Sequence, residues 1–273
     1  MENVWIKIEK YILKNLFDEY SYIARQLSKK SLFHIRISWG CLGNCSYCGV
    51  KKAIGSFKSK PIDQCITEFR KGLNQGYKHF VINADDTGAY GKDIGSSLPE
   101  LLDKITKISG KYEISIRNLH PKWIIKYIDD LEEIIKEYEI ISVDVPLQSW
   151  NRRILKLMNR CSDIEKIKDA FLRLHTSCPD LSINTEFILG FPTETEEEFK
   201  QNLDFIKESD FSRIGLYQFS CKDGTEAENI EPKIPQEEIL RRLKYAKKFM
   251  KNIGYSKLFL PKFHNVMMFY NKK

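Results

Sequence analysis

The sequence predicts an α/β fold, a partial (β/α)6 TIM-like barrel with an N-terminal helical extension. From residue 31 onward, strand-like and helix-like segments alternate six times, which is typical of parallel βα units. The strands alternate apolar and polar residues, whereas strands covered on both faces read as apolar runs. With 273 residues, 42% of them hydrophobic and 30% charged, the chain has a globular composition and enough length for a sizeable core. We therefore expect one compact domain.

Each expected element follows from local periodicity and from its flanking turn residues. The expected strands are Leu32–Trp39, His79–Asn83, Tyr112–Arg117, Ile140–Leu147, Leu181–Leu189 and Arg213–Phe219. The expected helices are Ile62–Gln75, Leu98–Ile108, Pro121–Tyr138, Asp163–Thr176, Glu194–Glu208 and Gln236–Asn252. We expect residues 1–30 to form the helical extension, 31–253 the barrel, and 254–273 a tail packed on the barrel as a strand or helix.

One face of the predicted sheet is polar. Polar residues recur at alternate positions of the strands, as with His34 and Arg36 in the first, Asp144 in the fourth, and Asn184 and Glu186 in the fifth. Successive side chains of a strand point to opposite faces, and a buried charge is costly unless it is paired or solvated. This face should line a solvated or ligand-filled cavity. The alternative is an open sheet with one face in water.

The sequence carries no signal peptide and no apolar run that could cross a bilayer, so we expect a cytoplasmic protein without a membrane partner. In a reducing compartment, its seven cysteines are metal ligands or buried small residues rather than disulfides. The net charge of +7 is compatible with an anionic partner such as RNA, or it serves solubility alone.

Three cysteines lie close together after the first predicted strand, at Cys41, Cys45 and Cys48, on a loop that also contains glycine and asparagine. A structural zinc site normally needs four ligands, and no second cysteine pair is present. The remaining cysteines are scattered singly, at Cys65, Cys161, Cys178 and Cys221. A [4Fe–4S] cluster ordinarily takes four thiolates. Three would leave one iron open to a chelating small molecule.

This CxxxCxxC loop at the end of the first strand of a βα barrel resembles that of the radical S-adenosylmethionine (SAM) family. The resemblance implies two cofactors, a [4Fe–4S] cluster and SAM. It also implies that the amino and carboxylate groups of SAM chelate the open iron. One electron from the reduced cluster then breaks the C5′–S bond, and the resulting 5′-deoxyadenosyl radical abstracts a hydrogen atom from the substrate. A reductant such as flavodoxin or ferredoxin would supply the electron.

Four further segments, within residues 31–227, are similar to methylthiotransferases that act on threonylcarbamoyladenosine in tRNA. Asn83–Gly95 resembles their "EDTGAYGRDIG" segment, and Pro146–Ser149 with Leu157–Arg160 resembles "PVQS…MNR". Gly190–Thr195 is similar to "GFPGET", and Gln218–Thr225 to "QFxxxxGT". Their common order indicates the same radical core.

Matched positions imply the roles of individual residues. The cluster ligands would be Cys41, Cys45 and Cys48, and Tyr47 would lie against the adenine of SAM. The SAM amino group would be read by the segment Ala84, Asp85 and Asp86. Its carboxylate and ribose would be contacted by Gln148, Arg160 and Glu186. On the residues alone, the alternative for Arg160 is a surface helix arginine, and for Asp85 and Asp86 it is a turn before Gly88.

The sequence also departs from those enzymes, which carry an N-terminal domain with a second cluster and a C-terminal β-barrel that grips RNA. No cysteine precedes Cys41, and residues 254–273 are short for such a barrel. Thr193 replaces a glycine, and Trp150–Arg152 replace small and acidic residues. Three hypotheses remain open: another radical reaction on a peptide or small molecule, with or without a partner protein; a minimal tRNA methylthiotransferase-like enzyme; and a non-catalytic iron–sulfur or zinc module that binds RNA.

Overall fold

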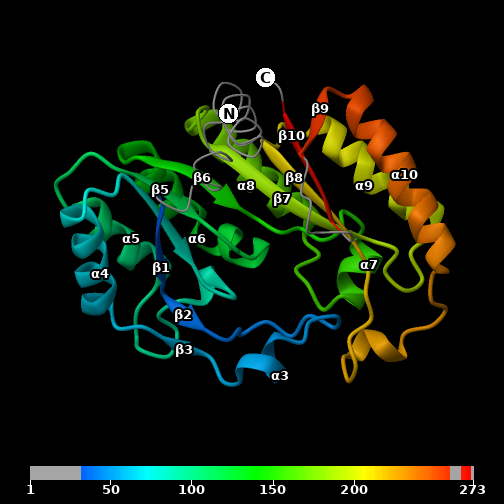
Figure 1. The fold of residues 1–273 in the computed structure, drawn as a ribbon, viewed down its shortest axis with the longest axis horizontal. Helices are drawn as coiled ribbons and strands as arrows, with labels where there is room; N and C mark the ends of the chain where they lie inside the picture. Colours follow the sequence, from blue (N-terminus) through cyan, green and yellow to red (C-terminus); the bar gives the residue numbers. More distant parts are fainter. Residues whose placement is uncertain (1–31, 259–265, 272–273) are drawn as a thin grey trace, which may run out of the picture.

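The structure, a computed structural model, describes residues 32–258 and 266–271 (Figure 1). The predicted helical extension at residues 1–30 lies outside the described residues. The main sheet has the strand order β1-β4-β5-β6-β7-β8-β10-β9. Its parallel strands are β1 (Leu32–Arg36), β4 (His79–Asn83), β5 (Glu113–Ile116), β6 (Ile140–Asp144), β7 (Ser182–Leu189) and β8 (Arg213–Gln218). All six predicted strands are present, which confirms the expected α/β class.

The sheet does not close into a complete barrel. Its edge strands are β1 and β9, and two antiparallel strands, β9 (Tyr255–Leu258) and β10 (Val266–Asn271), extend it beyond β8. Both strands come from the predicted tail. Strand β10 pairs antiparallel with both β8 and β9, whereas each parallel neighbour in the sheet needs a crossover connection.

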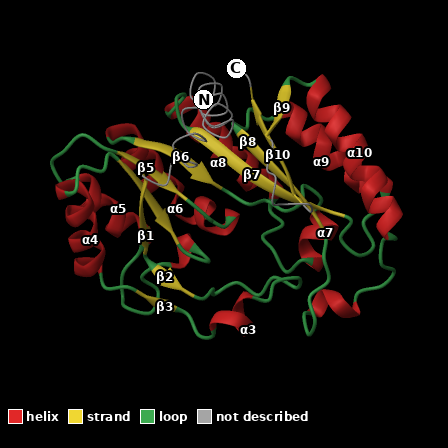
Figure 2. Ribbon diagram, viewed as in Figure 1, coloured by secondary structure: helices red, strands yellow, loops and turns green. Residues whose placement is uncertain are grey.

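The crossover helices lie along the outer side of the curved sheet (Figures 1 and 2). These are α4 (Ile62–Asn74), α5 (Leu98–Thr106), α6 (Pro121–Glu137), α8 (Ile164–Ser177), α9 (Glu196–Glu208) and α10 (Gln236–Asn252). The core between helices and sheet is apolar, with Ile35, Phe80, Ile114, Phe187 and Leu216 fully buried. This arrangement follows from the strand alternation, because the apolar face of each strand turns toward the helices.

Several element boundaries differ from the prediction for local reasons. The chain leaves the main sheet after β1, and β2 (Ser38–Trp39) pairs instead with β3 (Lys58–Ser59). This small hairpin carries the cysteine loop. Helix α9 begins two residues later than expected, because Thr195 caps it in a capping box with Glu198. Four further short helices were not expected: α3 (Val50–Ile54), α7 (Arg152–Leu157) and the two 3-10 helices η1 (Thr87–Ala89) and η2 (Glu226–Asn229).

Candidate functional site

The cysteine loop begins at a fixed turn. Gly40 has φ +74°, and a β-carbon there would lie 3.0 Å from the carbonyl oxygen of Ser56, so this turn requires glycine. Its N–H donates to Oδ2 of Asp85 at 2.9 Å, and the same oxygen accepts from Nη2 of Arg36 at 2.5 Å. The Asp85 carboxylate therefore connects the start of the loop to β1 through these two hydrogen bonds.

The middle of the loop is held by Ser46, which is buried. Its N–H donates to the carbonyl of Met158 at 3.0 Å, and its hydroxyl donates to the carbonyl of Leu157 at 2.7 Å. The N–H of Ala227 donates to the Ser46 carbonyl at 2.8 Å. Three segments far apart in sequence thus meet on one serine between the second and third cysteines.

Glu226 adds a second bridge between the same segments. One carboxylate oxygen accepts from Nδ2 of Asn44 at 3.2 Å, and the other accepts from Nδ2 of Asn159 at 2.7 Å. Asn44 lies between Cys41 and Cys45, and Asn159 directly precedes Arg160. The bridge fixes the position of Arg160 relative to the loop.

Arg160 reaches into the loop. Its Nη1 donates to Sγ of Cys45 at 3.4 Å and to the hydroxyl of Tyr47 at 3.3 Å, and Nη2 donates to the carbonyl of Pro146. The surface alternative for Arg160 is therefore wrong. Tyr47 packs edge-on against Phe191, with ring centroids 6.4 Å apart. The structure thus brings together three of the predicted positions.

Cys41 lies against Asp86, with 3.7 Å between Sγ and Oδ2. Burial, and then the nearby Asp86 carboxylate, raise the pKa of Cys41 to about 11. Burial also raises the pKa of Asp86. Without metal, the Cys41 thiol is therefore protonated at neutral pH, and metal binding must displace that proton.

Of the other predicted positions, Glu186 lies on β7, Gln148 in the loop after β6, and Ala84 directly after β4. The N–H of Gln148 donates to the Glu186 carbonyl at 2.7 Å, and Gln148 adopts φ +73°. The Glu186 carboxylate accepts from the hydroxyl of Tyr217 at 3.1 Å, and burial, followed by repulsion from Asp144, raises its pKa. The Ala84 carbonyl accepts from Nδ2 of Asn118 at 2.8 Å.

The polar face of the sheet holds a network that sequence reasoning identified only in part. Asp144, Asn184 and Arg213 are register neighbours on β6, β7 and β8. The Asp144 carboxylate accepts from Asn184 at 2.7 Å and from Arg213 at 2.9 Å, and Nε of Arg117 lies 3.8 Å away. The predicted charge of Asp144 is therefore present and paired, whereas the Glu186 carboxylate on β7 accepts from a hydroxyl.

His120 was not predicted as a site residue. Its Nδ1 accepts from the N–H of Lys122 and caps α6, directly after β5. Burial, then the positive charges of Arg160 and Lys122, lower the pKa of His120 to about 2. The His-Pro pair at the carboxyl end of a predicted strand is the pattern that could have identified it, because such ends carry binding residues in βα barrels.

Thr193 shows how the chain accommodates one of its departures. It adopts φ +68°, which explains why the similar segments have glycine there. Arg153 donates to its hydroxyl at 3.0 Å and to its carbonyl at 2.8 Å. Arg153 also pairs with both carboxylate oxygens of Glu198 at 2.7 Å. These bonds hold the turn between β7 and α9 in place.

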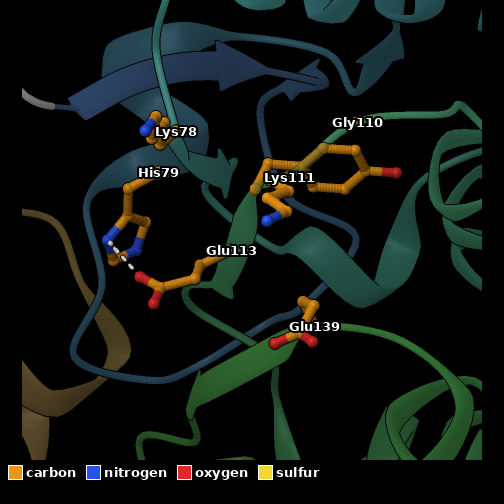
Figure 3. A pocket seen from close by; sticks show the side chains of 7 residues that line it. Lys78, His79, Gly110, Lys111, Glu113 and Glu139 are labelled. Carbon is orange, nitrogen blue, oxygen red and sulfur yellow. Dashed lines mark ion pairs between the residues drawn. The ribbon is translucent and has the colours of Figure 1, made fainter.

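A cavity of about 590 Å³ lies at the other end of the strands, by the start of β4 and β5 (Figure 3). Its lining residues are Lys78, His79, Gly110, Lys111, Tyr112, Glu113 and Glu139. His79 is buried, its Nε2 lies 2.7 Å from the Ser115 hydroxyl, and its Nδ1 lies 3.7 Å from the Glu113 carboxylate. None of the predicted site residues lines it.

Comparison with known proteins decides the family. The profile of the Radical SAM superfamily matches residues 35–206, which include the end of β1, the cysteine loop and the parallel strands β4 to β7. The chain belongs to the radical SAM superfamily. Members of this superfamily use a [4Fe–4S] cluster and SAM. Among solved structures, coproporphyrinogen III oxidase (HemN) from Escherichia coli, itself a radical SAM enzyme, has a TM-score of 0.63 at 19% identity. The structural match covers 88% of this chain and 55% of the oxidase, so the fold is that of a radical SAM partial barrel.

Within the superfamily, the chain is similar to methylthiotransferases. It is 35% identical to the ribosomal protein uS12 methylthiotransferase RimO of Chlamydia felis, over 83% of this chain and 50% of the relative. Identity to the tRNA-2-methylthio-N(6)-dimethylallyladenosine synthase of Thermotoga petrophila is 34%, over 89% and 56% respectively. A probable threonylcarbamoyladenosine tRNA methylthiotransferase of Archaeoglobus fulgidus is 34% identical, over 77% and 50%. The chain spans about half the length of these relatives.

The radical SAM cofactors fit the residues found here. In the described part of the chain, Oδ1 of Asp86 and Nε of Arg160 are buried without a hydrogen-bond partner, beside Cys41 and Cys45 respectively. The Asp86 oxygen can accept a hydrogen bond from the amino group of SAM, and the Arg160 nitrogen can donate one to its carboxylate. No three histidine, cysteine or acidic side chains of residues 32–258 and 266–271 converge as for a single ion. A cubane does not require such convergence, because each thiolate ligates a different iron.

In the same ranges, no helix is long and apolar enough to span a bilayer.

Proposed function

We propose that this chain holds a [4Fe–4S] cluster on Cys41, Cys45 and Cys48 and uses it to cleave SAM reductively for hydrogen abstraction from a substrate. The observation that carries the proposal is that the loop is contacted from both sides by polar groups: Asp86 at Cys41 and Arg160 at Cys45. When bound, the two cofactors supply one-electron cleavage of the C5′–S bond and a 5′-deoxyadenosyl radical. The protein supplies the ligands, the orientation and the exclusion of competing reactions.

Each predicted site residue would contact a different part of SAM. Asp86 Oδ1 would accept a hydrogen bond from the SAM amino group, and Arg160 would donate to its carboxylate with the planar guanidinium. Tyr47, held against Phe191, would pack against the adenine. Gln148 and Glu186 would contact the ribose and carboxylate from β7 and its neighbouring loop. Ala84 and Asp85 would shape the same wall, and Asp85 holds the loop through Gly40.

The names of the relatives describe action on tRNA or on a ribosomal protein, and this supports a proposal for the substrate class. We propose a macromolecular substrate modified by a methylthiotransferase-like reaction, with flavodoxin or ferredoxin as reductant. A cytoplasmic location and the division into 1–30, 31–253 and 254–273 stay predictions. A different radical reaction on a peptide or small molecule remains the second candidate, because Thr193 and Trp150 depart from the methylthiotransferase pattern.

Anaerobic reconstitution with iron and sulfide tests this proposal. Wild-type protein should bind about four irons per chain, the cubane count, and form 5′-deoxyadenosine from SAM with dithionite. Cys45→Ala should lose both properties, whereas Cys221→Ala, which removes an exposed cysteine outside the loop, should keep them. About eight irons per chain would indicate a second cluster and strengthen methylthiolation. An iron-loaded wild type that forms no 5′-deoxyadenosine would refute the proposal and favour a non-catalytic binding module.

A further inference from the structure

Three lysines converge on one pair of aromatic rings beside the site. Trp123 and Tyr127 of α6 are stacked, with centroids 5.7 Å apart and planes 10° from parallel. Nζ of Lys122 lies 4.7 Å from the Trp123 centroid. Nζ of Lys92 lies 5.7 Å from Trp123 and 5.5 Å from Tyr127, and Nζ of Lys126 lies 5.5 Å and 5.7 Å from the same rings. The lysines come from two separate segments of the chain.

These lysines carry positive charge that the described residues do not neutralise by ion pairing. Within residues 32–258 and 266–271, Lys92, Lys122 and Lys126 form no ion pair, whereas Lys104, Lys107 and Lys136 each pair with a carboxylate four residues earlier. Attraction to a ring face only partly offsets the mutual repulsion of three ammonium groups. An anion placed among them would remove that repulsion, so the cluster favours an anionic ligand.

A second aromatic side chain, Trp39, is joined to this cluster through the β2–β3 hairpin. Trp39 is 41% exposed, and Arg36 and Lys60 lie 5.7 Å and 5.6 Å from its ring centroid. The two groups are connected, because Ser59, paired opposite Ser38, accepts from the N–H of Gly91 and donates its own N–H to Asp93. Lys92 stands between these two contacts. We name Trp39, Lys92, Lys122 and Lys126 together the lysine–aromatic surface; Lys60, Trp123 and Tyr127, which contact them, are themselves buried.

The charge along α6 limits where a polyanion can lie. Lys122 and Lys126 are in the first half of this helix, which begins directly after β5. The second half is acidic, with Asp129, Asp130, Glu132, Glu133 and Glu137. Lys122 is also close enough to Asp86 to lower its pKa electrostatically, and Asp86 contacts Cys41. A polyanion would therefore be attracted next to the cysteine loop and repelled farther along the helix.

We propose that the lysine–aromatic surface binds a single-stranded segment of RNA and delivers it to the radical site. The phosphates would lie among Lys92, Lys122 and Lys126, and a base would stack on the exposed face of Trp39. Backbone-tracking cations next to an accessible aromatic ring are the usual elements of single-strand binding. The inference rests on the proposed function and selects RNA over a protein as substrate. It places recognition within the barrel itself.

Fluorescence anisotropy of the full chain, without cofactors, with a labelled RNA stem–loop tests the inference. The triple variant Lys92→Gln, Lys122→Gln, Lys126→Gln should bind about 50-fold more weakly at about 0.15 M salt. This follows from a slope of about 0.7 in log–log salt dependence for each phosphate contact, and the slope itself should fall by about 2. Trp39→Ala should weaken binding by about 10-fold through lost stacking.

The matched control is Lys104→Gln, Lys107→Gln, Lys136→Gln, which removes the same charge from ion-paired positions. This control should bind RNA nearly as the wild type does. Equal weakening by both triple variants would reduce the effect to net charge and overturn the inference. Undetectable RNA binding by the wild type would also overturn the inference. The same holds if an acidic polypeptide, and not RNA, binds the wild type and loses its affinity in the Lys92, Lys122 and Lys126 variant, because that result would favour a protein partner. Circular dichroism melting verifies that each variant is folded. Because binding is measured without cofactors, its failure leaves the 5′-deoxyadenosine test of the proposed function independent.

Discussion

Replacing Arg160 by methionine removes the guanidinium while keeping most of the side-chain volume. In the structure that guanidinium donates to Cys45, Tyr47 and the Pro146 carbonyl, and its Nε is left for a ligand. Losing one charge-assisted hydrogen bond to the SAM carboxylate costs about 1.5–3 kcal/mol. At about 1.4 kcal/mol per tenfold, the affinity for SAM should fall by about 10- to 150-fold.

Equilibrium dialysis of labelled SAM against reconstituted protein measures this loss, with affinity normalised to iron content. Arg160→Lys should recover only part of the affinity, because an ammonium group lacks the planar fork. Arg152→Met is the control, since this α7 arginine pairs with Glu165 and makes no contact with Cys45 or Tyr47. Unchanged SAM affinity in an iron-loaded Arg160→Met protein, or an equal loss in Arg152→Met, would refute the role of Arg160.

Two further predictions concern the supporting structure. Because the pKa of His120 is lowered to about 2, the folded state resists a proton that the unfolded state accepts near pH 6.5, so this residue reduces stability as the pH falls below 6.5. The free energy of unfolding should be about 2 kcal/mol lower at pH 5 than at pH 8 because of this residue. His120→Asn keeps a good N-cap and should abolish this contribution when unfolding by urea is measured at both pH values. An equal decrease at pH 5 in the variant would contradict the prediction. A β-carbon at Gly88 would lie 2.3 Å from the Trp123 ring, so Gly88→Ala should destabilise the fold by about 1–3 kcal/mol, whereas Gly49→Ala, with nothing within 4 Å, should be nearly neutral. Equal urea midpoints for both alanine variants would show that the Trp123 side chain is not fixed there.

Local patterns predicted most of the fold. The strand His79–Asn83 and the helix Gln236–Asn252 have the bounds expected from the sequence, because a short buried run and a long helical period are both visible in consecutive residues. Helix α7 was missed because six residues are too few to show a helical period. The departure of β2 from the main sheet depends on pairing with β3, which nothing in Ser38–Trp39 alone indicates.

The candidate site was also predicted only in part from the sequence. Spacing alone singled out Cys41, Cys45 and Cys48, because the three residues share one short loop. The bridge from Glu226 to Asn44 joins residues 182 positions apart, and no local pattern reveals such a contact. The role of Asp85 in holding Gly40 was also not visible, since it depends on two strands meeting at one edge. Thr193 looked like a departure in sequence, and only its φ and the bonds from Arg153 show how it is accommodated.

The central claim is that the protein binds three corners of a cubane and leaves the fourth iron to SAM. Mössbauer spectroscopy of protein reconstituted with isotopically enriched iron tests it directly, because it resolves individual iron sites. Adding SAM should change the parameters of one iron in each cluster and leave the other three unchanged. A spectrum that SAM leaves unaltered, or a protein that takes up zinc in place of iron, would contradict the claim.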